Sequence, residues 1–276
     1  MLMEVDRFDE AIDFIVKAVN NGDITEARID DAVTRILQVK LDAGIITDPF
    51  GDRLKTKYKT TGSAEARKVA EQLVEKSLVL MKNDKNVLPL QKGQSIYITG
   101  PAADNDQAQC GGWTIDWNRS PSKNITGVTN IKEGFAQVAK DKGIKIVDDP
   151  KDADVVILCV GEKSYAEWNG DAEDLDICRS KLALDGNDKA IEEAKTIGKP
   201  VVTCIVAGRN IFIGDYEKDW DGIVMCYLPG SEGQGVAKVL CGDAKFSGKL
   251  PSNWYASVSG IEKKEPWRKA GEGLTY

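Results

Sequence analysis

The sequence has 276 residues, of which 42% are hydrophobic and 29% charged, and its formal net charge is -7. A chain of this length and composition can bury a substantial core, and its acidic balance without a basic stripe argues against nucleic acid as a partner. No apolar run reaches the roughly 18 to 20 residues that span a bilayer, so we expect no membrane partner.

The first 45 residues show apolar side chains at helical spacing in two stretches, residues 7–21 and 25–43. Thr25 is the expected N-cap of the second helix, and Gly44 is its expected stop. We therefore predict a helix pair over residues 1–45.

The pattern changes after the helix pair. Residues 46–62 mix Pro, Gly, Lys and Thr without periodicity, which is typical of a linker. Another amphipathic pattern then predicts a helix over residues 63–82. We predict a second domain over residues 63–276, with the boundary near residue 60.

From residue 94 onward, short apolar runs alternate with helical stretches. This alternation is typical of βαβ units around a mostly parallel sheet, whose buried strands are continuous apolar runs. The predicted fold class is therefore α/β, a three-layer αβα sandwich. The predicted strands are SIYITG, IKIV, DVVILCVG, PVVTCIVAG and GIVMCYLPG, and the predicted helices cover residues 130–142, 187–197 and 231–241.

The residue types that are absent narrow the chemistry. The chain has no histidine, so acid/base catalysis has to come from carboxylates, Lys, Tyr or Cys. Its six cysteines form no close CxxC pair, which argues against a metal site, and three lie in apolar runs. We expect buried thiols. The cysteines are Cys110, Cys159, Cys178, Cys204, Cys226 and Cys241.

Ligands of open α/β sheets bind beyond the carboxyl ends of the strands, so the loops after the apolar runs are the candidate sites. The loop after DVVILCVG places six acidic residues beside Tyr165 and Trp168. A general acid is a carboxyl kept protonated by burial and neighbouring charges, and this loop offers candidates. A solvated acidic loop that caps the next helix is the alternative. The acidic residues are Glu162, Glu167, Asp171, Glu173, Asp174 and Asp176.

The loop after SIYITG contains Trp113 and Trp117, with Asp116 between them. Exposed indoles over a cleft suit the apolar faces of sugar rings. Two tryptophans four residues apart are equally typical of core anchors in a helical turn. Composition alone leaves both interpretations open.

The loop after GIVMCYL is a glycine-rich turn from Gly230 to Gly235 that follows a strand and opens a helix. Turns in this context can cradle phosphate, so a flavodoxin-like nucleotide-binding domain is one alternative. Against it, Glu232 would repel an anion at the helix N-terminus, and no P-loop lysine follows. A structural strand-to-helix turn is the favoured interpretation.

Six segments, in order along nearly the whole chain, resemble glycoside hydrolase family 3, in particular its β-glucosidases and β-glucan exohydrolases. Each segment is weakly specific alone, whereas six in the family's order are strongly specific. The segments are RIDDAVTRILQVKLDAGI with DPFGD, AEQLVEKSLVLMKNDKNVLPL, CGGWTIDW, VGEKSYAEWNGD, YLPGSEGQGVAKVLCGDAKFSGKLP and GLTY.

The resemblance implies a two-domain enzyme in which a (β/α)8-type barrel supplies a nucleophilic Asp and the α/β sandwich supplies the acid/base Glu. Residues 1–45 would then be the last helices of that barrel, whose remainder is missing. Glu167 in YAEWNGD matches the acid/base glutamate. Trp117 matches the tryptophan that stacks on the sugar at the aglycone side, and Trp113 matches a neighbouring aromatic. Glu162 is expected to be structural.

The implied reaction is retaining, exo-acting hydrolysis of terminal β-D-glucosyl residues in β-linked glucosides or oligosaccharides. The barrel Asp attacks the anomeric carbon while Glu167 protonates the leaving oxygen, and Glu167 then activates a water. This chemistry needs neither a metal nor an organic cofactor. Without its barrel partner, the chain alone is expected to be inactive.

Three further points concern substrate and location. A non-catalytic carbohydrate-binding fragment, in which Trp113 and Trp117 bind sugar without chemistry, is the main alternative to an enzyme part. The run ICRSKLALDGND departs from the family pattern, so the preferred substrate length stays open. Thiols that stay reduced favour a cytoplasmic location, and secretion stays open because the polypeptide's true start is expected to be absent.

Overall fold

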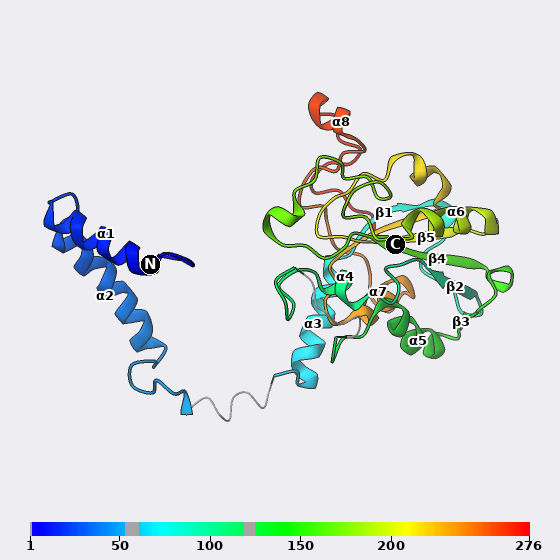
Figure 1. Cartoon of the computed structure of the whole chain (residues 1–276). Helices are drawn as coiled ribbons and strands as arrows, with labels where there is room; N and C mark the ends of the chain where they lie inside the picture. The colour runs from blue at the N-terminus through cyan, green and yellow to red at the C-terminus, as the bar shows by residue number, and fades with distance from the viewer. Residues whose placement is uncertain (1, 53–60, 119–124) are drawn as a thin grey trace. The chain divides into compact units, whose positions relative to one another are not determined.

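The structure, a computed structural model, describes residues 2–52, 61–118 and 125–276. The chain divides into two compact units, Met1–Ser63 and Ala64–Tyr276 (Figure 1). Residues 53–60 of the predicted linker lie outside the described residues. None of the helices in the described part of the chain is both long enough and apolar enough to cross a bilayer.

The first unit contains the two helices that the sequence predicted, α1 (Phe8–Asn20) and α2 (Glu26–Asp42). Thr25 caps α2 as expected, because its hydroxyl accepts a hydrogen bond from the backbone N–H of Arg28 at 3.2 Å. Gly44 follows α2 with a positive φ of 69°, which favours glycine. Although both helices are described in full and are amphipathic, neither has a buried residue. Their origin in a barrel stays a prediction.

The second unit is built on a six-stranded sheet in the order β1-β6-β5-β4-β2-β3. β1 runs antiparallel to β6, and the other pairs are parallel, so the predicted α/β class is confirmed. The strands are β1 (Val79–Asn83), β2 (Ser95–Thr99), β3 (Lys145–Ile146), β4 (Val155–Gly161), β5 (Val201–Val206) and β6 (Gly222–Tyr227). The helices are α3 (Ala64–Ser77), α4 (Asp106–Cys110), α5 (Ile131–Lys142), α6 (Asn187–Ile197), α7 (Gly233–Leu240) and α8 (Val258–Lys263).

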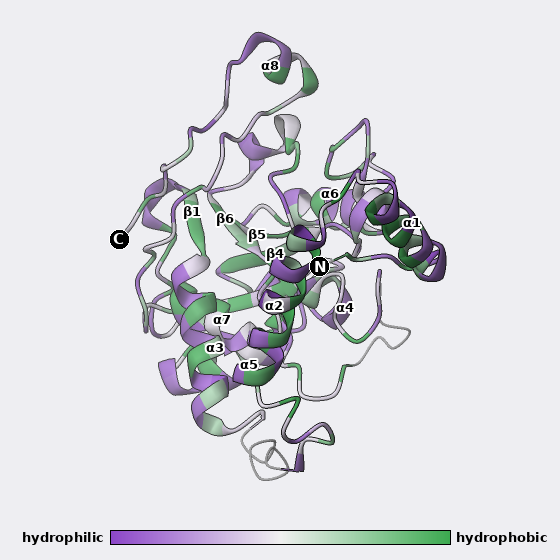
Figure 2. Ribbon diagram, turned by 90° about the vertical axis from the view of Figure 1, so that its left-hand side faces the viewer, coloured by the Kyte–Doolittle hydropathy of each residue, from purple (hydrophilic) through white to green (hydrophobic). Residues whose placement is uncertain are grey.

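Helices cover both faces of this sheet, which gives three layers. α3, α5 and α7 gather on one face (Figures 1 and 2), where they share a buried core with alternate residues of β4 such as Ile157. α6 packs on the other face, where Ile191 shares a second core with Leu158. Because successive side chains of a strand point to opposite faces, β4 is apolar throughout and fully buried.

The predicted helix over residues 63–82 is wrong at its C-terminal end. α3 ends at Ser77, and Val79–Asn83 form β1. Leu78 and Leu80 belong to one core, whereas Val79 and Met81 belong to the other. This alternation has the period of a strand buried on both faces, and the apolar run SLVLM hides it from a search for helical spacing.

The cysteines are largely buried, as predicted. All six are free thiols, and Cys159, Cys204 and Cys226 lie side by side within the central strands β4, β5 and β6. Cys241 is buried as well, whereas Cys110 and Cys178 are half-buried. In these positions a thiol acts as a small apolar side chain.

Candidate active site

Two loops beyond the carboxyl ends of β2 and β4 meet at Glu167. Glu167 begins the short 3-10 turn Glu167–Gly170 after β4. The indole Nε1–H of Trp113 donates to Oε1 of Glu167 at 2.9 Å, and the indole Nε1–H of Trp117 donates to Oε2 of the same carboxylate. The structure therefore brings together the three residues that the sequence singled out.

The two indoles serve as hydrogen-bond donors at the surface and do not anchor the core. Trp113 is 70% exposed, Trp117 is half-buried, and Glu167 is exposed. The interpretation of these tryptophans as core anchors is therefore wrong. Their apolar ring faces and the carboxylate between them offer the two kinds of contact that a sugar needs.

Trp168 adds a third indole that the sequence interpretation did not assign to the site. It is 65% exposed, and its ring packs edge-on against Trp117 with a centroid distance of 5.1 Å. Its position directly after Glu167 in the sequence could have indicated that it belongs to the site. An aromatic pair of this geometry fixes the orientation of the half-buried Trp117 ring.

The indole bonds leave room for proton transfer at Glu167. Each carboxylate oxygen has two lone-pair directions, and each Glu167 oxygen accepts one indole N–H. No other described residue donates a hydrogen bond to either oxygen, so among these residues the second direction is available for a proton or for a leaving-group oxygen. The two donors hold the carboxyl plane while Glu167 remains exposed, as a group that exchanges protons with a substrate requires.

The backbone at the site is strained. Trp113, Ile115 and Glu167 have positive φ angles of 60°, 68° and 43°, which side chains with a Cβ rarely adopt. Gly112 lets the loops approach closely, because a Cβ there would lie 2.3 Å from the carbonyl oxygen of Tyr165. These three strained residues lie in two facing loops, and their backbone conformations lower the stability of the folded chain at the site.

Asn118 joins the two loops. Its side-chain oxygen accepts hydrogen bonds from the backbone N–H of Ala166 at 3.0 Å and from Nδ2 of Asn169 at 3.2 Å. Its backbone carbonyl accepts a bond from the hydroxyl of Ser164 at 2.5 Å. Asn118 thus fixes the chain on both sides of Glu167, and no sequence motif pointed to it.

Arg209 and Glu162 clamp the base of the same loop. Glu162 is 3% exposed, and Nη2 of Arg209 donates to its Oε1 at 2.9 Å. Nη1 of Arg209 also donates to the carbonyl oxygen of Gly170 at 2.7 Å, and its guanidinium lies 4.7 Å from the ring centroid of Tyr165. Burial, with the charge of Glu162, raises the pKa of Tyr165 to about 12. Glu162 thus has the contacts of a structural residue.

The remaining acidic residues of the loop are arranged differently. Asp176 is buried, accepts bonds from the backbone N–H groups of Cys178 and Arg179, and pairs with the Arg179 guanidinium at 2.9 Å. Asp171 and Glu173 are exposed. The interpretation as a solvated loop fits Asp171 and Glu173, whereas Asp176 caps the following turn from a buried position. No metal-holding group of three or more Cys, Asp or Glu occurs among the described residues.

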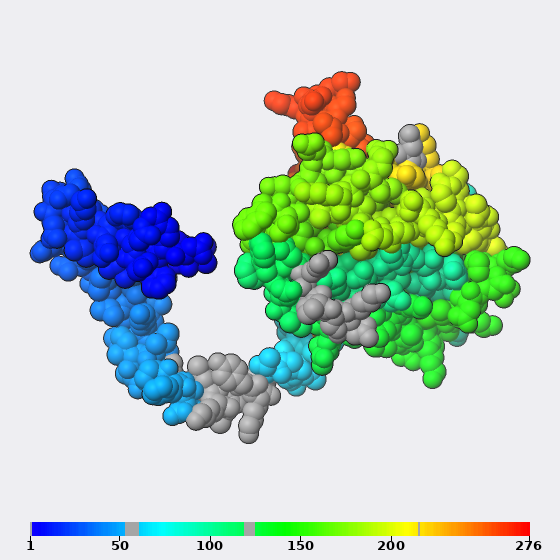
Figure 3. All heavy atoms as spheres, in the orientation of Figure 1, coloured from blue at the N-terminus to red at the C-terminus, as the bar shows by residue number. Residues whose placement is uncertain are grey.

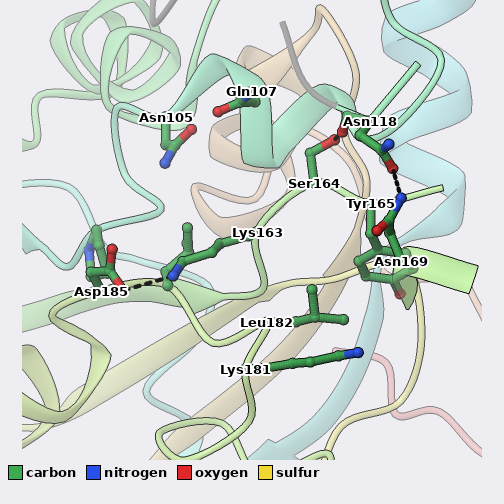
Figure 4. Close-up of a pocket in the computed structure, with 12 residues that line it drawn as sticks. Asn105, Gln107, Asn118, Lys163, Ser164, Tyr165, Asn169, Lys181, Leu182 and Asp185 are labelled. Carbon is green, nitrogen blue, oxygen red and sulfur yellow. Dashed lines mark hydrogen bonds and ion pairs between the residues drawn. The ribbon is translucent and has the colours of Figure 1, made fainter. Parts of the chain in front are cut away.

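A cleft of about 750 Å³ lies beside Glu167, between the same two loops and the segment that leads to α6 (Figure 4). Glu167, Trp113 and Trp117 do not line it, whereas their neighbours Asn118 and Asn169 do. In Figure 3 the yellow-green residues after β4 border the teal residues after β2 on the visible face. The lining residues are Pro101, Asn105, Gln107, Asn118, Lys163, Ser164, Tyr165, Asn169, Lys181, Leu182, Leu184 and Asp185.

The glycine-rich turn before α7 has structural contacts. Glu232 is 1% exposed and pairs with Nη2 of Arg67 at 3.1 Å. A Cβ at Gly233 would lie 2.5 Å from the backbone carbon of Asn130, so this glycine serves close packing against the start of α5. The buried carboxylate of Glu232 and this close packing favour the structural turn over a nucleotide site.

Comparison with known proteins agrees with the family resemblance of the sequence segments. The model of the glycosyl hydrolase family 3 C-terminal domain matches residues 78–276. The chain is 27% identical to a lysosomal beta glucosidase of Dictyostelium discoideum, over 95% of this chain and 36% of that protein. It is 28% identical to a periplasmic beta-glucosidase of Salmonella typhimurium, over 88% of this chain and 36% of that protein.

Solved structures share the fold. A mutant of the exo-1,3/1,4-beta-glucanase ExoP from a Pseudoalteromonas species is 32% identical and has a TM-score of 0.83, over 96% of this chain and 45% of that one. A mutant beta-glucosidase from Listeria innocua in complex with laminaribiose is 23% identical with a TM-score of 0.76, over 94% of this chain and 40% of that one. The chain thus spans well under two thirds of these proteins.

Proposed function

The chain belongs to glycosyl hydrolase family 3, and from this membership we propose that it is part of a retaining, exo-acting β-glucosidase that hydrolyses terminal β-D-glucosyl residues. The observation that carries the proposal is the exposed carboxylate of Glu167, held by the indole N–H groups of Trp113 and Trp117. Relatives named as β-glucosidases support the substrate class.

In this proposal Glu167 is the general acid and then the general base. It protonates the glycosidic oxygen as the bond to the leaving group breaks, and it later removes a proton from the water that releases the sugar. Trp117 stacks on the sugar at the aglycone side, and Trp113 borders the same position. The open lone-pair directions on the Glu167 oxygens suit both proton transfers.

The nucleophile in this proposal comes from a barrel domain outside the sequence. Retaining enzymes hold their two carboxyl groups about 5 to 5.5 Å apart, so the barrel has to face Glu167 closely. The exposure of Glu167 and of the Trp113 ring is consistent with a surface that another domain completes. The amphipathic helices α1 and α2, which have no buried residue, are consistent with belonging to that domain.

The test is hydrolysis of an aryl β-glucoside by this chain mixed with a separately produced family-3 barrel half. We expect activity only in the mixture, and we expect Glu167→Gln to lower kcat/KM by about 10² to 10⁴ when the leaving group is poor. Glu173→Gln, an exposed carboxyl in the same loop, is the matched control and should keep full activity.

Leaving groups and azide make the test specific for acid/base catalysis. A dinitrophenolate leaves without protonation, so the Glu167→Gln variant should lose far less on the dinitrophenyl glucoside than on a poor leaving group. Azide needs no general base and should restore turnover as the β-glucosyl azide. An equal loss for all leaving groups, with no azide rescue, would remove Glu167 from the role.

The non-catalytic alternative rests on the exposed rings of Trp113 and Trp168. If the chain binds glucose or cellobiose, loses that binding in Trp117→Ala, and stays inactive with a folded barrel half, the carbohydrate-binding fragment becomes the better description. The same mixture therefore decides between the two functions.

A further inference from the structure

The cleft beside Glu167 combines an apolar floor with a polar rim. Pro101, Tyr165, Leu182 and Leu184 supply the apolar surface, and both leucines are otherwise buried. Side-chain amides dominate the rim, and they belong to Asn105, Gln107, Asn118 and Asn169 (Figure 4). Its volume of about 750 Å³ is in the range of ligand sites and exceeds that of a single hexose ring.

The charges in the cleft fit a neutral ligand with many hydroxyl groups. Nζ of Lys163 pairs with Oδ1 of Asp185 at 2.7 Å, so these two charges compensate each other. Lys181 is exposed and forms no ion pair with any described residue. Lys181 also borders a neighbouring hollow together with Asp171, Glu173 and Asp174. A single ammonium group with acidic side chains nearby disfavours a phosphate or a polyanion, whereas amide groups that both donate and accept suit sugar hydroxyls.

The cleft is connected to the Glu167 loop by shared residues. Tyr165 and Asn169 lie two positions before and after Glu167, and both line the cleft. Asn118 follows Trp117, lines the cleft, and accepts the hydrogen bond from Asn169 that Figure 4 shows. Asn118 and Asn169 therefore belong both to the loops that hold Glu167 and to the lining of the cleft.

We propose that this cleft binds the leaving-group portion of longer β-linked oligosaccharides, beyond the sugar that contacts Trp117. The inference rests on the proposed function of Glu167, because the loops connect the cleft to that residue. Its outer wall is the run ICRSKLALDGND, which contributes Lys181, Leu182, Leu184 and Asp185. In this proposal these side chains contribute to the preference of the chain for substrate length.

The test is calorimetric titration of the full chain with glucose and with cello- and laminari-oligosaccharides of two to four units. We expect the Kd to fall with length and the Lys181→Ala variant to raise the trisaccharide Kd by about tenfold, the effect of one charged hydrogen bond, with glucose binding unchanged. Lys189→Ala on α6, another exposed lysine, is the matched control outside the cleft.

Methyl NMR signals of Leu182 and Leu184 give a second readout that does not depend on a substitution. The trisaccharide should shift them, and glucose should not. Unchanged leucine signals, or equal trisaccharide Kd values for Lys181→Ala and the parent chain, would overturn the proposal that the cleft binds oligosaccharides. Binding by the chain alone tests the cleft, whereas hydrolysis with Glu167→Gln in the barrel mixture tests the acid/base role, so the two can fail separately.

Discussion

Replacing Arg209 by Met should destabilise the second unit by leaving Glu162 buried without its main partner. Glu162 is 3% exposed, and three hydrogen bonds from the Arg209 guanidinium end on its carboxylate. Removing one partner of a buried ion pair costs about 3 to 5 kcal/mol. The Arg209 side chain is 27% exposed, so water can reach the gap, and we expect a loss of about 2 to 3 kcal/mol.

Urea unfolding followed by tryptophan fluorescence measures this loss. All six tryptophans lie in the second unit, so the signal is independent of α1 and α2. The matched double variant Glu162→Met, Arg209→Met replaces both charges by apolar side chains of similar length and should recover most of the stability. A loss below about 0.5 kcal/mol for Arg209→Met, or additive losses in the double variant, would refute the clamp.

The close approach of the loops and the half-buried Tyr227 give two more predictions. Gly112→Ala places a Cβ 2.3 Å from the Tyr165 carbonyl oxygen and should cost about 1 to 3 kcal/mol while shifting the indole N–H signals of Trp113 and Trp117, and unchanged signals would contradict the close approach. Burial raises the pKa of Tyr227 to about 12, above the ordinary value of about 10. Its stabilisation is therefore complete below about pH 10 and lost as pH rises through about 12, so Tyr227→Phe should make the fall of Tm over that range shallower, and parallel curves would contradict it.

The central strands and most helices of the second unit could be predicted because their patterns are local. Strands buried on both faces are continuous apolar runs, and the βαβ alternation follows from chain order. β1 could not be separated from α3, because Leu78 and Val79 directly continue the apolar positions of the helix. An antiparallel edge strand needs its partner to show that it is a strand, and Leu80 of β1 pairs with Val224 of β6, the last strand in the chain.

The residues that carry the candidate site were easier to predict than the residues that hold them. Glu167, Trp113 and Trp117 lie in short motifs with recognisable chemistry. Asn118 and Arg209 do not, because each acts on a loop far away in sequence, and their hydrogen bonds exist only after the sheet forms. Long-range support of this kind leaves no periodic pattern in a single sequence.

The backbone strain at the site is balanced by the hydrogen bonds and the ion pair that hold its loops. Each positive φ at Trp113, Ile115 and Glu167 costs on the order of 1 to 3 kcal/mol, and an unsupported loop would relax. Asn118 holds the chain around Glu167 from one side, and the ion pair of the buried Glu162 with the half-buried Arg209 holds the base of the same loop. The carboxylate can therefore stay exposed and fixed between two indoles in the absence of substrate. An enzyme that transfers a proton to a leaving oxygen benefits from such preorganisation, since the orientation of the acid is set before the sugar binds.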